Sequence, residues 1–181
     1  KSLLITYHPV TLETYSELQL AELLTSLSDL KATKLIFTAP NADSFSTLHS
    51  SMIEVFVSKN RRNAEYLVSM GQKVYLSALQ CVDAIVGNSS SGIIEAPILR
   101  TPTINIGSRQ DGRLKSSSIY DSKPDRESIS SAISNIYTKS VQDSLKKTTA
   151  LYAGGDVSGK ITDILCNVDL PKNLIKKFCD L

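Results

Sequence analysis

The sequence has 181 residues, enough for one well-buried domain and too few for two of ordinary size. Hydrophobic residues make up 41% and charged residues 21%, and a net charge of +2 spread along the chain argues against a nucleic-acid surface. No stretch has the length and apolar character of a membrane span or a signal peptide, so we expect no membrane partner. Cys81, Cys166 and Cys179 lack metal-ligand or redox spacing, and their odd number disfavours a disulfide framework. A cytoplasmic protein without a bound metal is therefore expected.

Apolar, strand-like segments alternate with amphipathic, helix-like segments along the chain. Strands are predicted at residues 2–7, 34–38, 64–68, 84–86 and 103–106, with a weaker sixth at 118–120. Helices are predicted between the first five strands, the third at 73–80 and the fourth at 93–99, and again at 125–137, 141–151 and 158–167. Thr14 and Glu17 form a capping-box pattern at the start of the first helix.

The first two helices each have an apolar face in the sequence pattern. The predicted faces are Leu18, Leu20, Leu23, Leu24 and Leu27 in the first helix, and Phe45, Leu48, Met52, Ile53 and Phe56 in the second. His49 matches no motif and is expected on an exposed helix surface.

This alternation predicts an α/β fold, a Rossmann-like parallel sheet with helices on both faces. Ligands of such sheets bind at the carboxyl ends of the strands. His8, Asn41, the turn at Ser89 and Arg109 all follow predicted strand ends, so we expect them along one rim.

Residues 84–95 read Ala-Ile-Val-Gly-Asn-Ser-Ser-Ser-Gly-Ile-Ile-Glu, the pattern of a strand, a tight turn and a helix start. Gly87 permits a sharp turn, the serines can cap, and Gly92 permits close approach of a ligand. Backbone amides that lack partners at such a helix start can bind a phosphate group. The carboxylate of Glu95 suits two sugar hydroxyls, and Pro97 predicts a short or kinked helix.

Other interpretations of this turn are weaker. A serine-hydrolase elbow requires Gly-x-Ser-x-Gly, whereas here three serines and an asparagine separate the two glycines. Asn88 begins a glycosylation acceptor pattern that matters only in a secreted protein. A capped turn with no ligand is also common in α/β domains.

Five blocks of the sequence, in order, resemble the motifs of UDP-N-acetylglucosamine 2-epimerases. They are His-Pro-Val-Thr at 8–11, Pro-Asn-Ala-Asp at 40–43, the serine-rich block at 87–96, the block with Gly-Ser-Arg-Gln-Asp-Gly-Arg at 102–113, and the glycine-containing segment 152–161. The resemblance is strongest to the hydrolysing branch, which serves sialic and related nonulosonic acid synthesis, and it includes the Lys-Lys-Phe-Cys-Asp tail at 176–180.

The resemblance implies the carboxyl-terminal, UDP-binding half of a two-domain, glycosyltransferase-B-like enzyme. Such an enzyme eliminates UDP to leave a 2-acetamidoglucal and then hydrates that intermediate, giving UDP and N-acetylmannosamine without a cofactor. The proton-transferring carboxylates would lie in a missing amino-terminal half, so the fragment alone is expected to be inactive. Full-length relatives tend to be homo-oligomers.

The resemblance also assigns roles to individual residues. His8 would assist departure of UDP, a task that suits a side chain titrating near neutrality. The implied binding residues are Asn41 at the cleft rim, Tyr75 against uracil, Ser89, Ser90, Ser91 and Gly92 at the diphosphate, Glu95 at the ribose, Arg109 at the phosphates or sugar, and Arg113 as a weaker candidate.

The same sequence features leave two other functions open. The same rim would serve as the donor domain of a glycosyltransferase with this fold, or as a nucleotide-binding module without chemistry. Residues 1–169 are expected to form the UDP-binding domain and residues 170–181 a basic helical tail. The sugar could be N-acetylglucosamine or a diacetamido relative.

Overall fold

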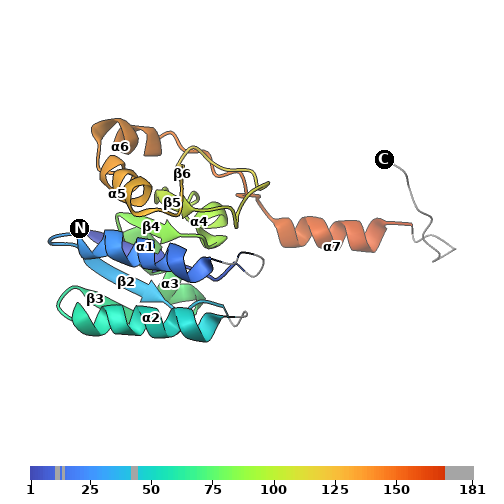
Figure 1. The fold of residues 1–181 in the computed structure, drawn as a ribbon. Helices are drawn as coiled ribbons and strands as arrows, with labels where there is room; N and C mark the ends of the chain where they lie inside the picture. Colours follow the sequence, from blue (N-terminus) through green and yellow to red (C-terminus); the bar gives the residue numbers. More distant parts are fainter. Residues whose placement is uncertain (11–12, 14, 42–44, 170–181) are drawn as a thin grey trace.

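A computed structural model describes residues 1–10, 13, 15–41 and 45–169, and shows a parallel six-stranded sheet flanked by helices (Figure 1). The strands are β1 (Ser2–Thr6), β2 (Lys34–Thr38), β3 (Ala64–Leu67), β4 (Ala84–Gly87), β5 (Thr103–Ile106) and β6 (Ile119–Ser122). Their order in the sheet is β3-β2-β1-β4-β5-β6, and every neighbouring pair is parallel. The predicted α/β fold is confirmed, including the sixth strand.

Alternate residues of the central strands enter two different cores, one on each face of the sheet. Leu3 and Ile5 of β1 join the larger core, whereas Leu4 joins a smaller one with Leu79 and Ile85. All five side chains are at most 2% exposed. Burial on both faces explains why these strands read as unbroken apolar runs.

The helices are α1 (Ser16–Ser28), α2 (Ser46–Lys59), α3 (Gly71–Cys81), α4 (Ser91–Ile94), α5 (Arg126–Asn135), α6 (Lys139–Leu145) and α7 (Val157–Asn167). The larger core contains residues from α1, α2, α5 and α6, and the smaller core lies on the side of α3. The fourth helix begins and ends earlier than predicted, because Pro97 lacks the amide that a longer helix would need. The predicted helix 141–151 instead begins at Lys139 and ends at Leu145.

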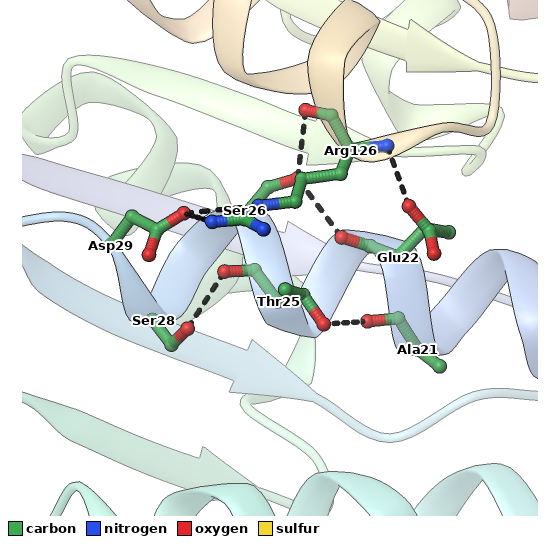
Figure 2. A network of polar contacts seen from close by, with 7 residues as sticks. All are labelled: Ala21, Glu22, Thr25, Ser26, Ser28, Asp29 and Arg126. Carbon is green, nitrogen blue, oxygen red and sulfur yellow. Dashed lines mark hydrogen bonds and ion pairs between the residues drawn. The ribbon is translucent and has the colours of Figure 1, made fainter.

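A polar clamp joins α1 to the start of α5 (Figure 2). Arg126 donates from Nη2 and Nε to Oδ2 of Asp29 at 2.8 and 3.2 Å, and its backbone amide donates to Glu22 Oε2 at 2.8 Å. The Ser26 hydroxyl donates to the Arg126 carbonyl at 3.1 Å. These contacts hold the start of α5 against α1, although the ion pair itself is half exposed.

Several expectations about the helix faces are wrong. Leu18 is 62% exposed, Phe45 57% and Leu48 47%. Leu18 lies two positions from both of the buried residues Ser16 and Leu20, which puts it on the opposite face of α1, and Phe45 precedes α2 as its N-cap residue. His49, expected on the surface, is fully buried between α1 and α2, with its ring stacked on Tyr7 at 6.0 Å. Thr14 of the predicted capping box and the tail 170–181 lie outside the described residues.

The last described helix, α7, lies apart from the rest of the domain (Figure 1). It has no buried residue, and its apolar side chains recur at a spacing that places them on one face. These side chains are Val157, Ile161, Ile164, Leu165 and Val168, which are 49–70% exposed.

Candidate functional site

The strand order reverses between β1 and β4, which is where ligands of open parallel sheets bind. His8 follows β1 and Asn88 follows β4, and the two residues are joined by reciprocal hydrogen bonds. The His8 amide donates to Asn88 Oδ1 at 2.7 Å, and Asn88 Nδ2 donates to the His8 carbonyl at 2.8 Å. Both residues are at most 5% exposed, so the bonds fix the two strand ends in a dry setting.

Gly87 makes this close pairing possible. Its φ is +144°, and a Cβ there would collide with the carbonyl oxygen of Thr6. The positive φ agrees with the expectation that Gly87 permits a sharp turn, and the close approach of β1 is a second reason for a glycine there.

The backbone carbonyl of Asn88 also binds two side chains of the 107–113 turn beside the β1/β4 switch point. Arg109 Nη1 donates to this oxygen at 3.1 Å, and Gln110 Nε2 donates to it at 2.8 Å. Gln110 is 2% exposed, whereas Arg113 is exposed and has no ion pair within the described part of the chain. Arg109 is thus anchored beside the switch point, and Arg113 is not.

The backbone of Asn41, in the Pro-Asn-Ala-Asp motif, orients the imidazole of His8. Its Nδ1 accepts a hydrogen bond from the backbone amide of Asn41 at 3.0 Å, so the proton of the neutral ring lies on Nε2. The ring is thereby set to donate from Nε2. Asn41 contributes its backbone here, and its side chain is exposed.

A cavity of about 320 Å³ opens at the carboxyl ends of β1, β2 and β3 and beside α3. Five predicted site residues line it, namely His8, Asn41, Tyr75, Ser89 and Ser91. Burial, with a smaller contribution from Glu95, raises the pKa of Tyr75, while the nearby hydroxyls of Ser91 and Thr6 act to lower it. The Tyr75 hydroxyl and Ser91 Oγ are buried without a hydrogen-bond partner among the described residues.

The serine turn offers different amides from those predicted. The Gly92 amide already donates to the Ser89 carbonyl at 3.1 Å, and the Ser91 amide lies 3.3 Å from Ser89 Oγ. The amides of Ser89 and Ser90 have no acceptor within the described ranges. Because α4 has only four residues, its dipole is small, so an anion here would depend on these amides, the hydroxyls and Arg109.

Gly92 has a packing role that the sequence did not indicate. A Cβ at Gly92 would lie 2.5 Å from Cγ2 of Thr103, whose hydroxyl donates to the Gly92 carbonyl at 2.8 Å. A glycine is therefore required at position 92 because β5 packs against it, and not because a ligand approaches there. Glu95, half-buried at the end of α4, is near enough to Tyr75 to affect its pKa but does not line the cavity.

Other sites are less suited to ligand binding. A larger hollow of about 820 Å³ lies between β6 and α5, but it contains none of the predicted site residues and no group from the switch point. Within the described ranges, no cluster of metal-ligating side chains is found. No helix there is long and apolar enough to cross a membrane.

Sequence reasoning missed Asn88 and Gln110 as organisers of the site. Asn88 begins a glycosylation pattern, but its side chain is buried and both Oδ1 and Nδ2 are hydrogen-bonded to the His8 backbone. The sequence feature that could have indicated its role is its position directly after a strand that ends in glycine.

Residues 1–166 match the sequence pattern of the family described as UDP-N-acetylglucosamine 2-epimerase. The chain belongs to this family. The resemblance inferred from the five sequence blocks is therefore confirmed.

Three relatives show the extent of the similarity. The chain is 38% identical, over 98% of its length and 46% of the relative, to a Campylobacter jejuni GDP/UDP-N,N'-diacetylbacillosamine 2-epimerase (hydrolyzing). It is 37% identical over 69% of its length, and 32% of the relative, to the Escherichia coli polysialic acid biosynthesis protein P7. The Methanocaldococcus jannaschii UDP-GlcNAc 2-epimerase, crystallised with UDP-GlcNAc and UDP, shares the fold, with a TM-score of 0.70 and 15% identity over 91% of this chain and 45% of that one. The chain thus spans about half the length of its hydrolysing relative.

Proposed function

We propose that this chain is the nucleotide-binding half of a hydrolysing 2-epimerase that acts on a UDP-linked 2-acetamido sugar. The observation that carries the proposal is the convergence of His8, the 89–91 turn and Tyr75 on one cavity at the β1/β4 switch point. Family membership and the hydrolysing relative support the same assignment.

In this proposal, the rim of the sheet holds UDP in an extended pose. The amides of Ser89 and Ser90, with the hydroxyls of residues 89–91, contact the diphosphate, and Arg109 adds a cationic donor. Tyr75 lies against the uracil, Glu95 accepts hydrogen bonds from the ribose, and Asn41 borders the sugar. Gly92 stays within the phosphate turn as a packing residue, and Arg113 is a peripheral cation.

The chemistry of this half is stabilisation of the leaving group. Elimination breaks the bond between C1 of the sugar and the phosphate oxygen while C2 loses its proton, so negative charge develops on the β-phosphate. Amides and Arg109 aimed at that phosphate would lower the barrier, and His8 would donate to it from Nε2. Water then adds hydroxyl to C1 and a proton to the opposite face of C2, giving a free 2-epimerised sugar.

A second half of the protein would supply the proton-transferring carboxylates. The chain covers 46% of its hydrolysing relative, and the apolar stripe of α7 has no partner among the described residues. We propose residues 1–169 as the nucleotide domain and 170–181 as its helical tail. Self-association of the full protein and a cytoplasmic, sialic-acid-type pathway are part of this proposal and rest on the family resemblance.

A turnover assay on the intact protein tests this function. The protein is incubated separately with UDP-N-acetylglucosamine, a UDP-diacetamido sugar and its GDP-linked counterpart, and both nucleotide and free sugar are identified. We expect UDP together with the 2-epimer of one of these sugars. Transfer of the sugar to an added acceptor would support a glycosyltransferase instead, and UDP binding without turnover of any sugar would support a non-catalytic module.

A further inference from the structure

A chain of hydrogen bonds connects the turn that carries His8 to the turn that carries Arg109. The Tyr7 hydroxyl donates to Gln19 Oε1 at 2.8 Å, and Gln19 Nε2 donates to Glu13 Oε2 at 2.6 Å. Ser108 Oγ donates to the other carboxylate oxygen, Glu13 Oε1, at 2.6 Å. We call these four residues the Glu13 relay.

The relay begins at a rigid point of the core. Tyr7 is 1% exposed, and its ring stacks on the buried His49, so its hydroxyl is held in place. Gln19 lies near the start of α1, and its amide is oriented by the bond that it accepts from the Tyr7 hydroxyl. Glu13 therefore receives two hydrogen bonds, and bonds to a charged acceptor are among the stronger ones in proteins.

The relay ends beside a proposed ligand group. Ser108 immediately precedes Arg109, just as Tyr7 immediately precedes His8. Arg109 Nη1 donates to the Asn88 carbonyl, which holds the arginine side chain. Within the turn, the Ser108 carbonyl accepts from the Asp111 amide at 2.9 Å, and the Ser108 hydroxyl binds Glu13. Glu13 thus contacts this turn through the Ser108 hydroxyl, and Asn88 contacts it through the side chains of Arg109 and Gln110.

We propose that Glu13 and Gln19 are positioning residues for the nucleotide site, holding Arg109 at a fixed distance from His8. This inference rests on the proposed function. Neither residue touches the cavity, so the effect is exerted through Ser108. Glu13 and Gln19 are half-buried and Ser108 is exposed, so loss of these bonds should affect ligand affinity more than folding.

The chemistry of the relay permits an exchange test. Gln19→Glu alone places two carboxylates against each other and removes the amide donor. Combining it with Glu13→Gln restores every bond, because the new carboxylate accepts from Tyr7 and from the new amide, whose oxygen accepts from Ser108. The double variant also has the net charge of the wild type, so its recovery cannot come from a change in overall charge.

The experiment measures UDP and uridine affinity calorimetrically in the intact protein, with melting temperatures alongside. We expect Gln19→Glu to weaken UDP binding about 10- to 100-fold, as a displaced contact group does, with uridine binding and melting temperature little changed. The double variant should recover to within about threefold of wild type, and Gln80→Glu, the same change on the exposed end of α3, should have no effect.

Two results overturn the inference. If wild type binds UDP and Gln19→Glu binds it equally well, the relay does not position the site. If the double variant stays as weak as Gln19→Glu, the loss comes from something other than the relay. Absence of UDP binding by wild type would instead reject the proposed function itself.

Discussion

Asn88 and His8 are joined by two hydrogen bonds, in which Asn88 both accepts from and donates to the His8 backbone, at 2.7 and 2.8 Å. Since Asn88 also presents its carbonyl to Arg109 and Gln110, one buried residue connects three segments of the rim. The proposed catalytic histidine and the proposed phosphate-binding arginine are therefore positioned by the same asparagine.

The first prediction concerns the chemistry of this pairing. Asn88→Asp keeps an acceptor for the His8 amide but turns the donor into a second acceptor facing the His8 carbonyl. We expect a loss of about 1–3 kcal/mol in the free energy of unfolding, the cost of a buried group left unpaired, and weaker UDP binding. Urea unfolding measures the first quantity. Asn135→Asp, on the exposed end of α5, is the control, and equal losses in both variants would contradict the role of Asn88.

A second prediction distinguishes the two arginines of the 107–113 turn. Arg109→Ala should lower turnover by the equivalent of ~2.7–4 kcal/mol of barrier, as loss of a donor to developing charge does. Arg113→Ala should change turnover little, because that side chain is exposed and unanchored. Steady-state kinetics of both variants decide the matter. Equal effects would show that Arg109 has no special position.

Ser90→Ala gives a third prediction. Its hydroxyl makes no hydrogen bond within the described ranges, so removing it should leave the melting temperature unchanged. If the hydroxyl contacts the diphosphate, turnover should fall nonetheless. Wild-type kinetics in this variant would restrict the contribution of Ser90 to its backbone amide.

The fourth prediction is a backbone effect. Gly87→Ala should prevent folding, because the new methyl group collides with Thr6 and the φ of +144° is strained for any other residue. Gly155→Ala is a matched control, since nothing lies within 4 Å of a Cβ there. Circular dichroism of the two purified variants should show a folded control and an unfolded or insoluble Gly87 variant.

A fifth prediction follows from the buried His49. Burial lowers its pKa below 6.5, partly opposed by Glu17. The unfolded chain then binds a proton at higher pH than the folded one, so this group's contribution to stability is complete above pH 6.5 and falls as pH drops from 6.5 toward the folded pKa. His49→Gln should flatten this decline in urea unfolding. His8→Gln should retain it, because the chain has only these two histidines.

Comparison of particular elements shows what the sequence could predict. The strands were predictable because the central ones are buried on both faces and read as apolar runs. The predicted helix faces were wrong at Leu18, which lies on the face of α1 opposite the buried Leu20, and at Phe45, which precedes the first residue of α2. His49 was misplaced because histidine is a polar residue type, although its spacing four residues before Ile53 puts it on the buried face of α2, against a tyrosine and a serine.

The site was partly predictable for equally physical reasons. The sequence predicted that His8, Asn41 and Ser89 lie close together, because each follows a strand and parallel strands end on the same edge of the sheet. The roles of Asn88, Gln110 and the Glu13 relay depend on contacts between segments far apart in sequence, which no local pattern encodes.

The most direct test of the account is a crystal structure of the intact protein with UDP. We expect the diphosphate against the amides of Ser89 and Ser90, within hydrogen-bond distance of Arg109, and the His8 ring facing the β-phosphate. UDP bound elsewhere, for example in the larger hollow between β6 and α5, with the 89–91 turn unoccupied, would contradict the proposed nucleotide site.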